Sequence, residues 1–239
     1  MRPSRATWNN CVARRRADSR GRIEWIVSMG NAFITLEGIE GVGKSTNLAY
    51  IEDILVAAGQ DVVVTREPGG TPLGEQIRRW VLDGDHGGLS AEVEAMLMFA
   101  ARAQHLDEVI RPALASGAWV ICDRFTDATI AYQGGGRGVA PGLLEALKRA
   151  VQCDLEPDLT LLFDAPVEVG FERIANREPD NFEREGRAFF DKVRASYLAL
   201  AASNPDRIKR IDAAQPLEAV KQELRNHLGA LLQRVITDA

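Results

Sequence analysis

The stretch FITLEGIEGVGKST at residues 33–46 decides how the rest of this 239-residue chain is interpreted. A short apolar run breaks into glycines, and Gly38, four further residues and then Gly43-Lys44-Ser45 have the Walker A spacing. Small residues at this spacing let successive backbone N–H groups point at phosphate oxygens, and the helix that follows adds its N-terminal dipole. We expect Lys44 to contact the β- and γ-phosphates of a nucleoside triphosphate and the Ser45 hydroxyl to hold Mg²⁺. The alternative, a glycine-rich turn that binds nothing, is disfavoured because the motif lies between an expected strand and an expected helix.

The composition is that of an ordinary globular protein, with 46% hydrophobic and 26% charged residues, enough for one substantial core. We expect residues 29–239 to form a single domain. Cys11, Cys122 and Cys153 are far apart and include no CxxC pair, so we expect neither a disulfide framework nor a zinc site, which fits a reducing cytoplasm. No apolar run approaches the roughly 20 residues that span a bilayer, and no signal peptide is recognisable, so no membrane role is expected.

Residues 1–28 differ from the rest of the chain because they carry seven arginines against Asp18 and Glu24. Their net charge of +5 leaves −10 for residues 29–239, given −5 for the whole chain. An arginine-rich arm can bind nucleic acid or act as a transit peptide. It contains no recognisable motif, however, and Met29 stands just before the first expected strand. We therefore favour a disordered extension, or an upstream misreading of the start codon, and expect no nucleic-acid partner.

Apolar runs of two kinds alternate beyond the glycine-rich loop. Short β-branched runs, such as DVVVT at residues 61–65, predict strands, and their continuous apolar character implies a sheet covered on both faces. Strands are expected in the apolar run that opens the glycine-rich stretch and near residues 61–65, 118–122, 159–163 and 207–211; helices are expected near 46–58, 76–82, 91–115, 141–151, 167–174, 185–202 and 216–235. This alternation predicts an α/β fold with a doubly wound, five-stranded parallel sheet flanked by helices and with ligands bound at the carboxyl ends of the strands.

The strand WVICD at residues 119–123 runs directly into Arg124. An aspartate at the end of a strand normally supplies the Mg²⁺-side carboxylate beside a P-loop, so we expect Asp123 to be the partner of Ser45. A guanidinium next to it can hold a second phosphate through two hydrogen bonds, which favours a phosphate-bearing acceptor over water; the alternative for Arg124 is a surface ion pair. The expected ATP-binding residues are Gly38, Ile39, Glu40, Gly41, Val42, Gly43, Lys44, Ser45 and Thr46.

Four motifs in order make the chain resemble the bacterial thymidylate kinases. They are the glycine-rich loop, TREPGGTPLGEQIR at residues 65–78, FAARAQH at 99–105 and DRFTDATIAYQGGGRG at 123–138. The resemblance covers residues 32–235. It implies phosphorylation of thymidine 5′-monophosphate (dTMP) by MgATP in dTTP synthesis, a parallel sheet of the P-loop nucleoside-monophosphate-kinase type, and a homodimer.

The resemblance also implies roles for individual side chains. Arg78 and Arg124 would clamp the 5′-phosphate of dTMP, where two guanidiniums offset its charge and aim an oxygen at the γ-phosphorus. Arg102 and Gln133 would hydrogen-bond the thymine edge, for which a glutamine offers both a donor and an acceptor. Together with Lys44 and Asp123, Arg124 would form the catalytic centre.

The sugar and the faces of the base are assigned in the same way. Glu40 would accept a hydrogen bond from the 3′-hydroxyl of the sugar, although a solvated loop carboxylate is the alternative. Tyr132 would stand where a ribose 2′-hydroxyl must not, and Thr129 would be a second base contact. The family usually has a phenylalanine that stacks on the base four residues before the arginine at position 102; this chain has Met98 there, with Phe99 next to it, and either is a candidate to cover the base.

A mobile lid is expected at residues 173–187, RIANREPDNFEREGR. In relatives without an arginine in the glycine-rich loop, the lid is thought to bring an arginine onto the transferred phosphoryl group. Asn181 stands where that arginine is expected here, so the charge must come from a neighbour. Arg177 is our first choice and Arg173 the second, with Arg184 a further candidate. The alternative is that these arginines are solvated surface charges in weak ion pairs.

Two other functions compete with a thymidylate kinase. A kinase for another nucleoside monophosphate is disfavoured by Arg102 and Gln133 and would be distinguished by a panel of acceptors. A non-catalytic nucleotide-binding module is disfavoured because the chain has the complete set of Lys44, Ser45, Asp123 and Arg124. Lack of turnover with every monophosphate would favour that module.

Overall fold

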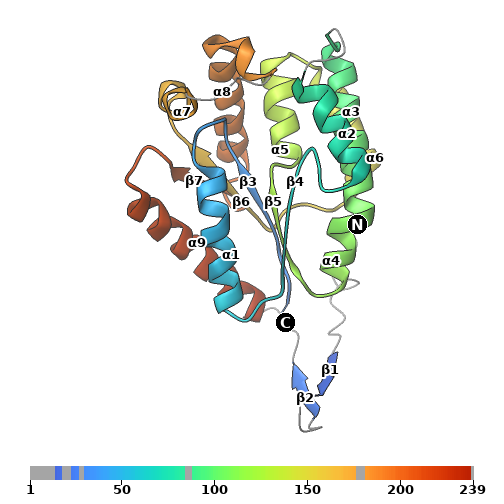
Figure 1. The fold of residues 1–239 in the computed structure, drawn as a ribbon, viewed down its shortest axis with the longest axis vertical. Helices are drawn as coiled ribbons and strands as arrows, with labels where there is room; N and C mark the ends of the chain where they lie inside the picture. The colour runs from blue at the N-terminus through green and yellow to red at the C-terminus, as the bar shows by residue number, and fades with distance from the viewer. Residues whose placement is uncertain (1–13, 18–22, 27–29, 84–87, 176–180, 238–239) are drawn as a thin grey trace.

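The computed structural model describes residues 14–17, 23–26, 30–83, 88–175 and 181–237. Its centre is a five-stranded sheet in the order β4-β5-β3-β6-β7, in which every neighbouring pair is parallel (Figure 1). The strands are β3 Phe33–Glu37, β4 Val62–Arg66, β5 Trp119–Asp123, β6 Leu159–Asp164 and β7 Ile208–Asp212. The expected five-stranded parallel α/β fold is confirmed.

Helices cover both sides of this sheet. On one side α1 packs with α9 and against β4 and β5, and on the other α3 continues through a π-helical stretch into α4, which packs on β5. The helices are α1 Lys44–Ala57, α2 Pro72–Asp83, α3 Ala91–His105, the π-helix Leu106–Ile110, α4 Arg111–Ala115, α5 Thr126–Thr129, the π-helix Ile130–Gly136, α6 Pro141–Gln152, α7 Val167–Ile174, the 3-10 helix Glu183–Glu185, α8 Arg187–Ser203 and α9 Leu217–Thr237. In the described part of the chain, none of them combines the length and the apolar character that crossing a membrane requires.

The helical segment after β5 was not expected from the sequence. Thr126–Thr129 is α-helical and Ile130–Gly136 is π-helical, although the segment ends in three glycines, which disfavour helices. Packing against α8 explains the difference. A Cβ added to Gly135 would lie 2.6 Å from the Cβ of Ser196, and one added to Gly136 would lie 2.4 Å from the Phe189 ring. The glycines therefore allow α8 to approach this segment closely, and tertiary packing outweighs helix propensity.

Helix α2 begins four residues earlier than expected, at Pro72 instead of residue 76. The Thr71 hydroxyl accepts a hydrogen bond from the Gly74 N–H at 3.0 Å, and proline follows at the first helical position. Both features are typical of a helix N-terminus. The longer helix places Arg78 in its second turn, above the carboxyl end of the sheet.

The arginine-rich extension contains two short strands, β1 Arg14–Ala17 and β2 Ile23–Ile26, where no regular structure was expected. They pair only with each other, in a two-stranded antiparallel sheet separate from the five-stranded one. The central sheet is therefore complete without them.

Candidate active site

The glycine-rich loop joins β3 to α1 at the carboxyl edge of the sheet. Its glycines are required by geometry: Gly38 has φ 131° and Gly41 has φ 73°. A Cβ on Gly38 would lie 2.2 Å from the Phe163 carbonyl oxygen, and one on Gly41 would lie 2.0 Å from the Gly170 carbonyl oxygen. The loop is thus packed closely against the end of β6 and against α7, which only glycine at these positions permits.

Lys44 begins α1 and folds back into the loop. Its Nζ donates to the carbonyl oxygens of Gly38 and Ile39, both at 2.8 Å, and the side chain is buried. Burial and the nearby charge of Arg124 lower the pKa of Lys44 to about 8. The first turn of α1 contains no acidic residue, so the positive helix terminus and Lys44 together favour an anion here.

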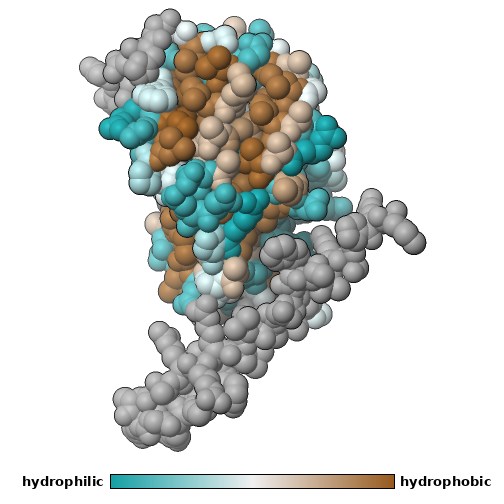
Figure 2. All heavy atoms as spheres, turned by 90° about the vertical axis from the view of Figure 1, so that its right-hand side faces the viewer, coloured by the Kyte–Doolittle hydropathy of each residue, from teal (hydrophilic) through white to brown (hydrophobic). Residues whose placement is uncertain are grey.

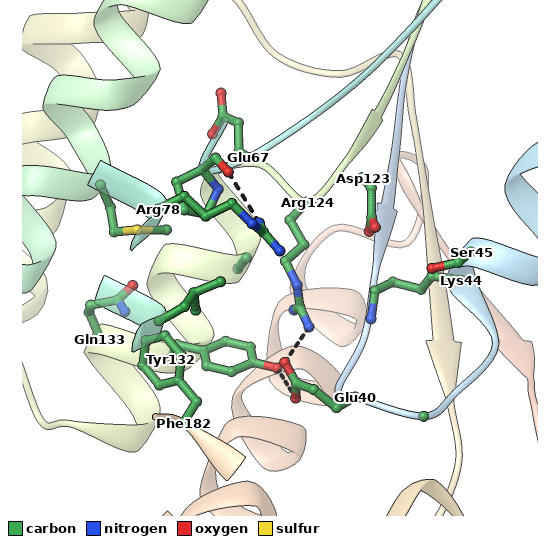
Figure 3. Close-up of a pocket in the computed structure, with 15 residues that line it drawn as sticks. Glu40, Lys44, Ser45, Glu67, Arg78, Asp123, Arg124, Tyr132, Gln133 and Phe182 are labelled. Carbon is green, nitrogen blue, oxygen red and sulfur yellow. Dashed lines mark hydrogen bonds and ion pairs between the residues drawn. The ribbon is translucent and has the colours of Figure 1, made fainter. Parts of the chain in front are cut away.

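A cleft of about 240 Å³ opens beside the loop at the carboxyl ends of β3, β4 and β5 (Figure 3). Figure 3 shows Lys44 and Gln133 at opposite sides of this cleft, with Arg124 between them in the view. Its lining contains half of the site residues expected from the sequence. The residues are Glu40, Gly41, Lys44, Ser45, Glu67, Pro68, Arg78, Leu82, Met98, Asp123, Arg124, Ala128, Tyr132, Gln133 and Phe182.

Arg124 is held in the cleft by a network of its own. Its Nη1 donates to the Gly38 carbonyl at 3.0 Å and its Nη2 to Glu40 Oε1 at 2.6 Å, while the guanidinium carbon lies 4.9 Å from the centre of the Tyr132 ring. The Tyr132 hydroxyl donates to the other Glu40 oxygen at 2.6 Å. Arg124 also has φ 70°, a conformation that non-glycine residues seldom adopt and that clusters at functional sites. These contacts enclose the Arg124 side chain, so it is not the surface ion pair that was the alternative expectation for this residue.

Behind Arg124 lies a buried carboxyl that sequence reasoning missed. Glu37, the last residue of β3, accepts hydrogen bonds from the Phe125 N–H at 2.8 Å and from the Tyr197 hydroxyl at 2.7 Å. Tyr197 in turn accepts from Arg124 at 3.3 Å. Burial, with a contribution from the charge of Asp127, raises the pKa of Glu37 to about 8. A glutamate that ends an otherwise apolar strand was the only sequence signal.

The phosphate-binding arginine expected on α2 also faces the cleft. Arg78 donates from Nη1 to the Pro68 carbonyl oxygen at 3.2 Å, in the loop after β4. Burial and the neighbouring charge of Arg66 lower the pKa of Arg78. Two guanidiniums, those of Arg78 and Arg124, therefore line one cavity, an arrangement that favours a dianionic ligand.

The expected base contacts are divided between the cleft wall and the layer behind it. Met98 and Gln133 line the cleft, whereas Phe99, Arg102 and Thr129 do not. Met98 therefore occupies the position from which a side chain can cover a base, and Phe99 is in the core, 4.6 Å beneath the Arg102 guanidinium.

Arg102 is fully buried and fixed on two sides. Its Nε donates to Glu67 Oε2 at 2.7 Å and its Nη2 to the Thr129 hydroxyl at 2.9 Å, and His105 Nδ1 lies 3.0 Å from the other Glu67 oxygen. Glu67, which was not expected to be functional, thus orients Arg102 from the end of β4. Within the described part of the chain, four buried side-chain atoms have no hydrogen-bond partner; they are Asn47 Oδ1, Arg102 Nη1, Asp123 Oδ1 and Gln133 Oε1. Three of them belong to expected site residues, and such atoms are costly unless a ligand satisfies them.

The structure describes two parts of the expected lid, residues 173–175 and residues 181–187. Asn181 binds the C-terminal end of α2, through its backbone N–H to the Leu82 carbonyl at 2.9 Å and its Nδ2 to the Val81 carbonyl at 3.3 Å. Phe182 lines the cleft and packs edge-on against Tyr132, with ring centres 5.4 Å apart. Asn181 therefore serves as a cap for helix carbonyls that have no partner within the helix.

The candidate lid arginines are placed differently. Arg173, in the last turn of α7, donates to the Ala213 carbonyl at 3.0 Å and to the Gly41 carbonyl at 3.5 Å, and it is not among the residues that line the cleft. Arg184 lies in the short 3-10 helix after Phe182. Arg177 is outside the described residues.

Comparison with known proteins agrees with this geometry. The family model described as Thymidylate kinase matches residues 36–224. The chain is 56% identical to a thymidylate kinase of Pseudomonas putida over 207 residues, 86% of this chain and 99% of the relative, and 57% identical to that of Pseudomonas savastanoi over 206 residues, 86% and 98% of the two chains. It also matches the crystal structure of thymidylate kinase from Ehrlichia chaffeensis with 34% identity and a TM-score of 0.67, over 84% of this chain and 99% of that one. The resemblance found in the sequence is confirmed, and the chain belongs to the thymidylate kinase family, the nucleoside monophosphate kinases that phosphorylate dTMP to dTDP with ATP.

Proposed function

We propose that the phosphoryl group is transferred inside the cleft, with the triphosphate of ATP on the glycine-rich loop and dTMP between Arg124 and Gln133. The observation that carries this proposal is that Lys44, Asp123, Arg124 and Gln133 line one cavity. On the donor side, Lys44 and the backbone N–H groups at the start of α1 bind the β- and γ-phosphates. Their charges offset the charge that develops on the transferred group.

On the acceptor side, Arg78 and Arg124 hold the 5′-phosphate of dTMP. Both guanidiniums line the cavity, and each already donates to a backbone carbonyl that fixes its direction. The attacking oxygen belongs to a phosphate that is anionic at neutral pH, so a strong general base is not required. Positioning of this oxygen against the γ-phosphorus and neutralisation of charge supply the catalysis.

The nucleoside is recognised on the far side of Arg124. Met98 covers the base, Gln133 Oε1 accepts from the thymine N3–H, and Arg102 Nη1 donates to the O4 oxygen. The proposal is supported by the two atoms themselves, which are buried and without a partner in the structure. Glu40 accepts from the 3′-hydroxyl, and the Tyr132 ring, fixed against Arg124 and Phe182, excludes a 2′-hydroxyl.

The residues present also fit Mg²⁺, which the family reaction uses with ATP. Hard oxygen ligands suit this ion, and Asp123 offers a buried carboxylate oxygen without a partner beside the exposed Ser45 at the start of α1. Ser45 and Asp123 would hold the ion between them. When bound, Mg²⁺ offsets phosphate charge.

A coupled ADP-release assay tests the function directly. Purified protein is given ATP with dTMP, dUMP, dCMP, dGMP or dAMP. We expect efficient turnover only with dTMP, and slower turnover with dUMP, which lacks one methyl group worth roughly 1–3 kcal/mol in an apolar pocket. Comparable rates with dCMP or dGMP would overturn the assigned pocket.

Lys44→Ala then tests the donor side. We expect it to abolish turnover while leaving the calorimetric dissociation constant for dTMP nearly unchanged, because Lys44 contacts only the donor phosphates. Lys192→Ala, a change to an exposed lysine on α8, is the matched control and should retain turnover. Unchanged turnover in Lys44→Ala would contradict the proposal.

We also propose that the protein is a homodimer in the cytoplasm. The support for a dimer is an apolar face of α2 and α3, where Leu73, Trp80, Val93 and Met96 are each between 39% and 46% exposed. Figure 2 shows apolar side chains gathered over the upper part of the face that contains these helices. Cys122 and Cys153 are free thiols, as is usual in a reducing compartment. Light scattering should give twice the chain mass, and Met96→Glu should shift it toward the monomer.

A further inference from the structure

The side-chain amide of Gln133 is held in one orientation. Its Nε2 donates to Glu94 Oε1, in the first turn of α3, at 2.8 Å. Its Oε1 is buried and has no partner. Gln133 lines the cleft and is only 1% exposed, so its free oxygen can be satisfied by a ligand or a water molecule in the cleft, or by a rotation of the amide.

Glu94 makes that rotation unfavourable. The side chain is 2% exposed, and both of its oxygens lie near Arg137, with Nη2 3.4 Å from Oε2 and Nε 3.5 Å from Oε1. Arg137 donates to both oxygens of this carboxylate and Gln133 donates to one of them, so the carboxylate serves its neighbours as an acceptor. A rotated amide would place the Gln133 oxygen against this carboxylate, two acceptors facing each other in a buried site.

Arg137 is itself fixed from the other side. Its Nη1 donates to Glu185 at 2.5 Å, and its guanidinium carbon lies 5.5 Å and 5.3 Å from the centres of the Phe182 and Phe189 rings. Glu94 is thus held by a cation that cannot easily turn away. The orientation of the amide is set by a chain of contacts that runs from the segment over the cleft to the base-binding residue.

We propose that Glu94 is a positioning residue that selects thymine over cytosine by fixing the Gln133 amide with its oxygen toward the base. This inference rests on the proposed role of Gln133 as a base contact. Thymine presents an N3–H donor, which that oxygen accepts. Cytosine presents an unprotonated N3, which would face the oxygen as a second acceptor. The two bases therefore differ at the one atom whose partner Glu94 determines.

Glu94→Gln is the direct test, because it keeps the shape and removes the charge. Arg137 donates to the new amide and should keep its oxygen, which leaves the new NH₂ group facing Gln133. Gln133 must then turn its own oxygen to that NH₂ group and its own NH₂ group to the base. The substrates compared are dTMP and 5-methyl-dCMP, which share the 5-methyl group and differ at N3 and at the 4-position.

We expect the ratio of kcat/KM for dTMP over 5-methyl-dCMP to fall roughly 10–100-fold in Glu94→Gln, as for one misdirected hydrogen bond to a buried group. The efficiency with 5-methyl-dCMP should rise in absolute terms, which damage to the fold cannot produce. It should remain a poor substrate because Arg102 still faces its 4-amino group. Glu92→Gln, an exposed position on the same helix, is the matched control and should leave the ratio unchanged.

A second pair of variants separates positioning from structural support. In a Gln133→Leu background no amide remains to be oriented, so adding Glu94→Gln should not change the ratio further. An unchanged ratio in Glu94→Gln alone, or an equal change with and without Gln133, would overturn the inference. If the wild-type protein itself does not prefer dTMP, the proposed function fails instead, so the two failures are distinguishable.

A measurement on the wild-type protein covers the case in which Glu94→Gln does not fold. The side-chain ¹⁵N–¹H resonances of Gln133 are assigned by their loss in Gln133→Leu. With Nε2 bound to Glu94, they should exchange slowly with solvent and shift little when dTMP binds. A large shift on binding would show the NH₂ group turned toward the base and would overturn the inference.

Discussion

Lys44 and Arg124 donate to the same acceptor, the carbonyl oxygen of Gly38, at 2.8 Å and 3.0 Å. Lys44 begins α1 and Arg124 follows β5. A single backbone oxygen therefore orients both the side chain that we propose to bind ATP and the one that we propose to bind dTMP. Like charges this close repel, and the proximity of Arg124 contributes to the lowered pKa of Lys44. An anion bound beside either side chain would offset this repulsion.

The pKa of Lys44, lowered to about 8, predicts an alkaline limb in the pH profile. As pH rises through about 8, the free enzyme loses the Lys44 proton, and a neutral amine does not attract the phosphates of ATP. We expect kcat/KM for ATP to fall above pH 8. The fall in kcat should occur at a higher pH than the fall in kcat/KM, because bound phosphates favour the charged form of the Lys44 amine.

Lys44→Arg is the control for this profile, because a guanidinium stays protonated throughout the range. Whatever activity the variant retains should show no limb near pH 8. A limb that persists would have to arise from another group, and the assignment to Lys44 would be wrong.

Glu37→Gln should change how stability depends on pH. The pKa of Glu37 is raised from 4.5 to about 8 in the fold, so the folded state binds this proton more tightly than the unfolded state. The resulting stabilisation is fully present below pH 4.5 and is lost as pH rises through about 8. The free energy of unfolding of the variant, relative to the wild type, should therefore rise by roughly 2–5 kcal/mol between pH 4.5 and pH 9. Urea denaturation across this range measures it, with Glu92→Gln as the control; a difference independent of pH would contradict the prediction.

The strands could be predicted from the sequence because each is a continuous apolar run. The fourth was expected at residues 159–163 and is found at Leu159–Asp164. The order of the strands could not be predicted, since right-handed crossovers are compatible with several orders of five parallel strands. The two π-helical segments were not foreseeable either, because no residue preference distinguishes them from α-helix.

The place of a side chain in the cleft was predictable where it depends on spacing along the chain, as for Lys44 in the glycine-rich loop and Asp123 at the end of a strand. Glu67 and Glu94 were missed because the partner of a carboxylate is known only in three dimensions. A weak signal existed for Glu94. It shares one helix face with Met98 and Ala101, at spacings of four and three residues, and that face is buried.

Asn181→Ala should weaken the binding of dTMP. The change removes the hydrogen bond from Nδ2 to the Val81 carbonyl, while Phe182 beside Asn181 lines the cleft. We expect KM for dTMP to rise roughly 3–10-fold, the effect of one neutral hydrogen bond, with little change in KM for ATP. Steady-state kinetics with each substrate varied in turn measures both constants. An unchanged KM for dTMP would show that the contact with α2 does not support the cleft.

The lid-arginine hypothesis stays a prediction, because Arg177 lies outside the described residues. We expect Arg177→Ala to lower kcat by at least about 100-fold with little change in dTMP affinity, since an arginine on a transferred phosphoryl group is typically worth roughly 10³–10⁵ in turnover. Arg173 is held by the Ala213 and Gly41 carbonyls, so Arg173→Ala is the second variant and Arg184→Ala the third. All three are assayed at saturating substrate. If none loses more than a few-fold, no lid arginine acts on the phosphoryl group.

Removal of residues 1–28 should leave activity and Tm almost unchanged. Among the described residues, β1 and β2 pair only with each other, and the Gly30 carbonyl at the start of the body accepts from Trp119 Nε1 at 3.2 Å. The truncated chain retains that contact. Calorimetry compares the Tm of the full-length and truncated chains, and the ADP-release assay compares their activity. A fall in Tm of several degrees would show that the extension packs on the body.

The glycine-rich loop packs closely against α7 at Gly41 and Gly170. A Cβ on Gly41 would lie 2.0 Å from the Gly170 carbonyl oxygen, and one on Gly170 would lie 2.5 Å from the Glu40 carbonyl oxygen. Backbone therefore rests on backbone, without a flexible side chain to absorb a displacement. A side chain at Gly41 or at Gly170 would therefore force the glycine-rich loop away from α7, so both positions are closed to every residue larger than glycine.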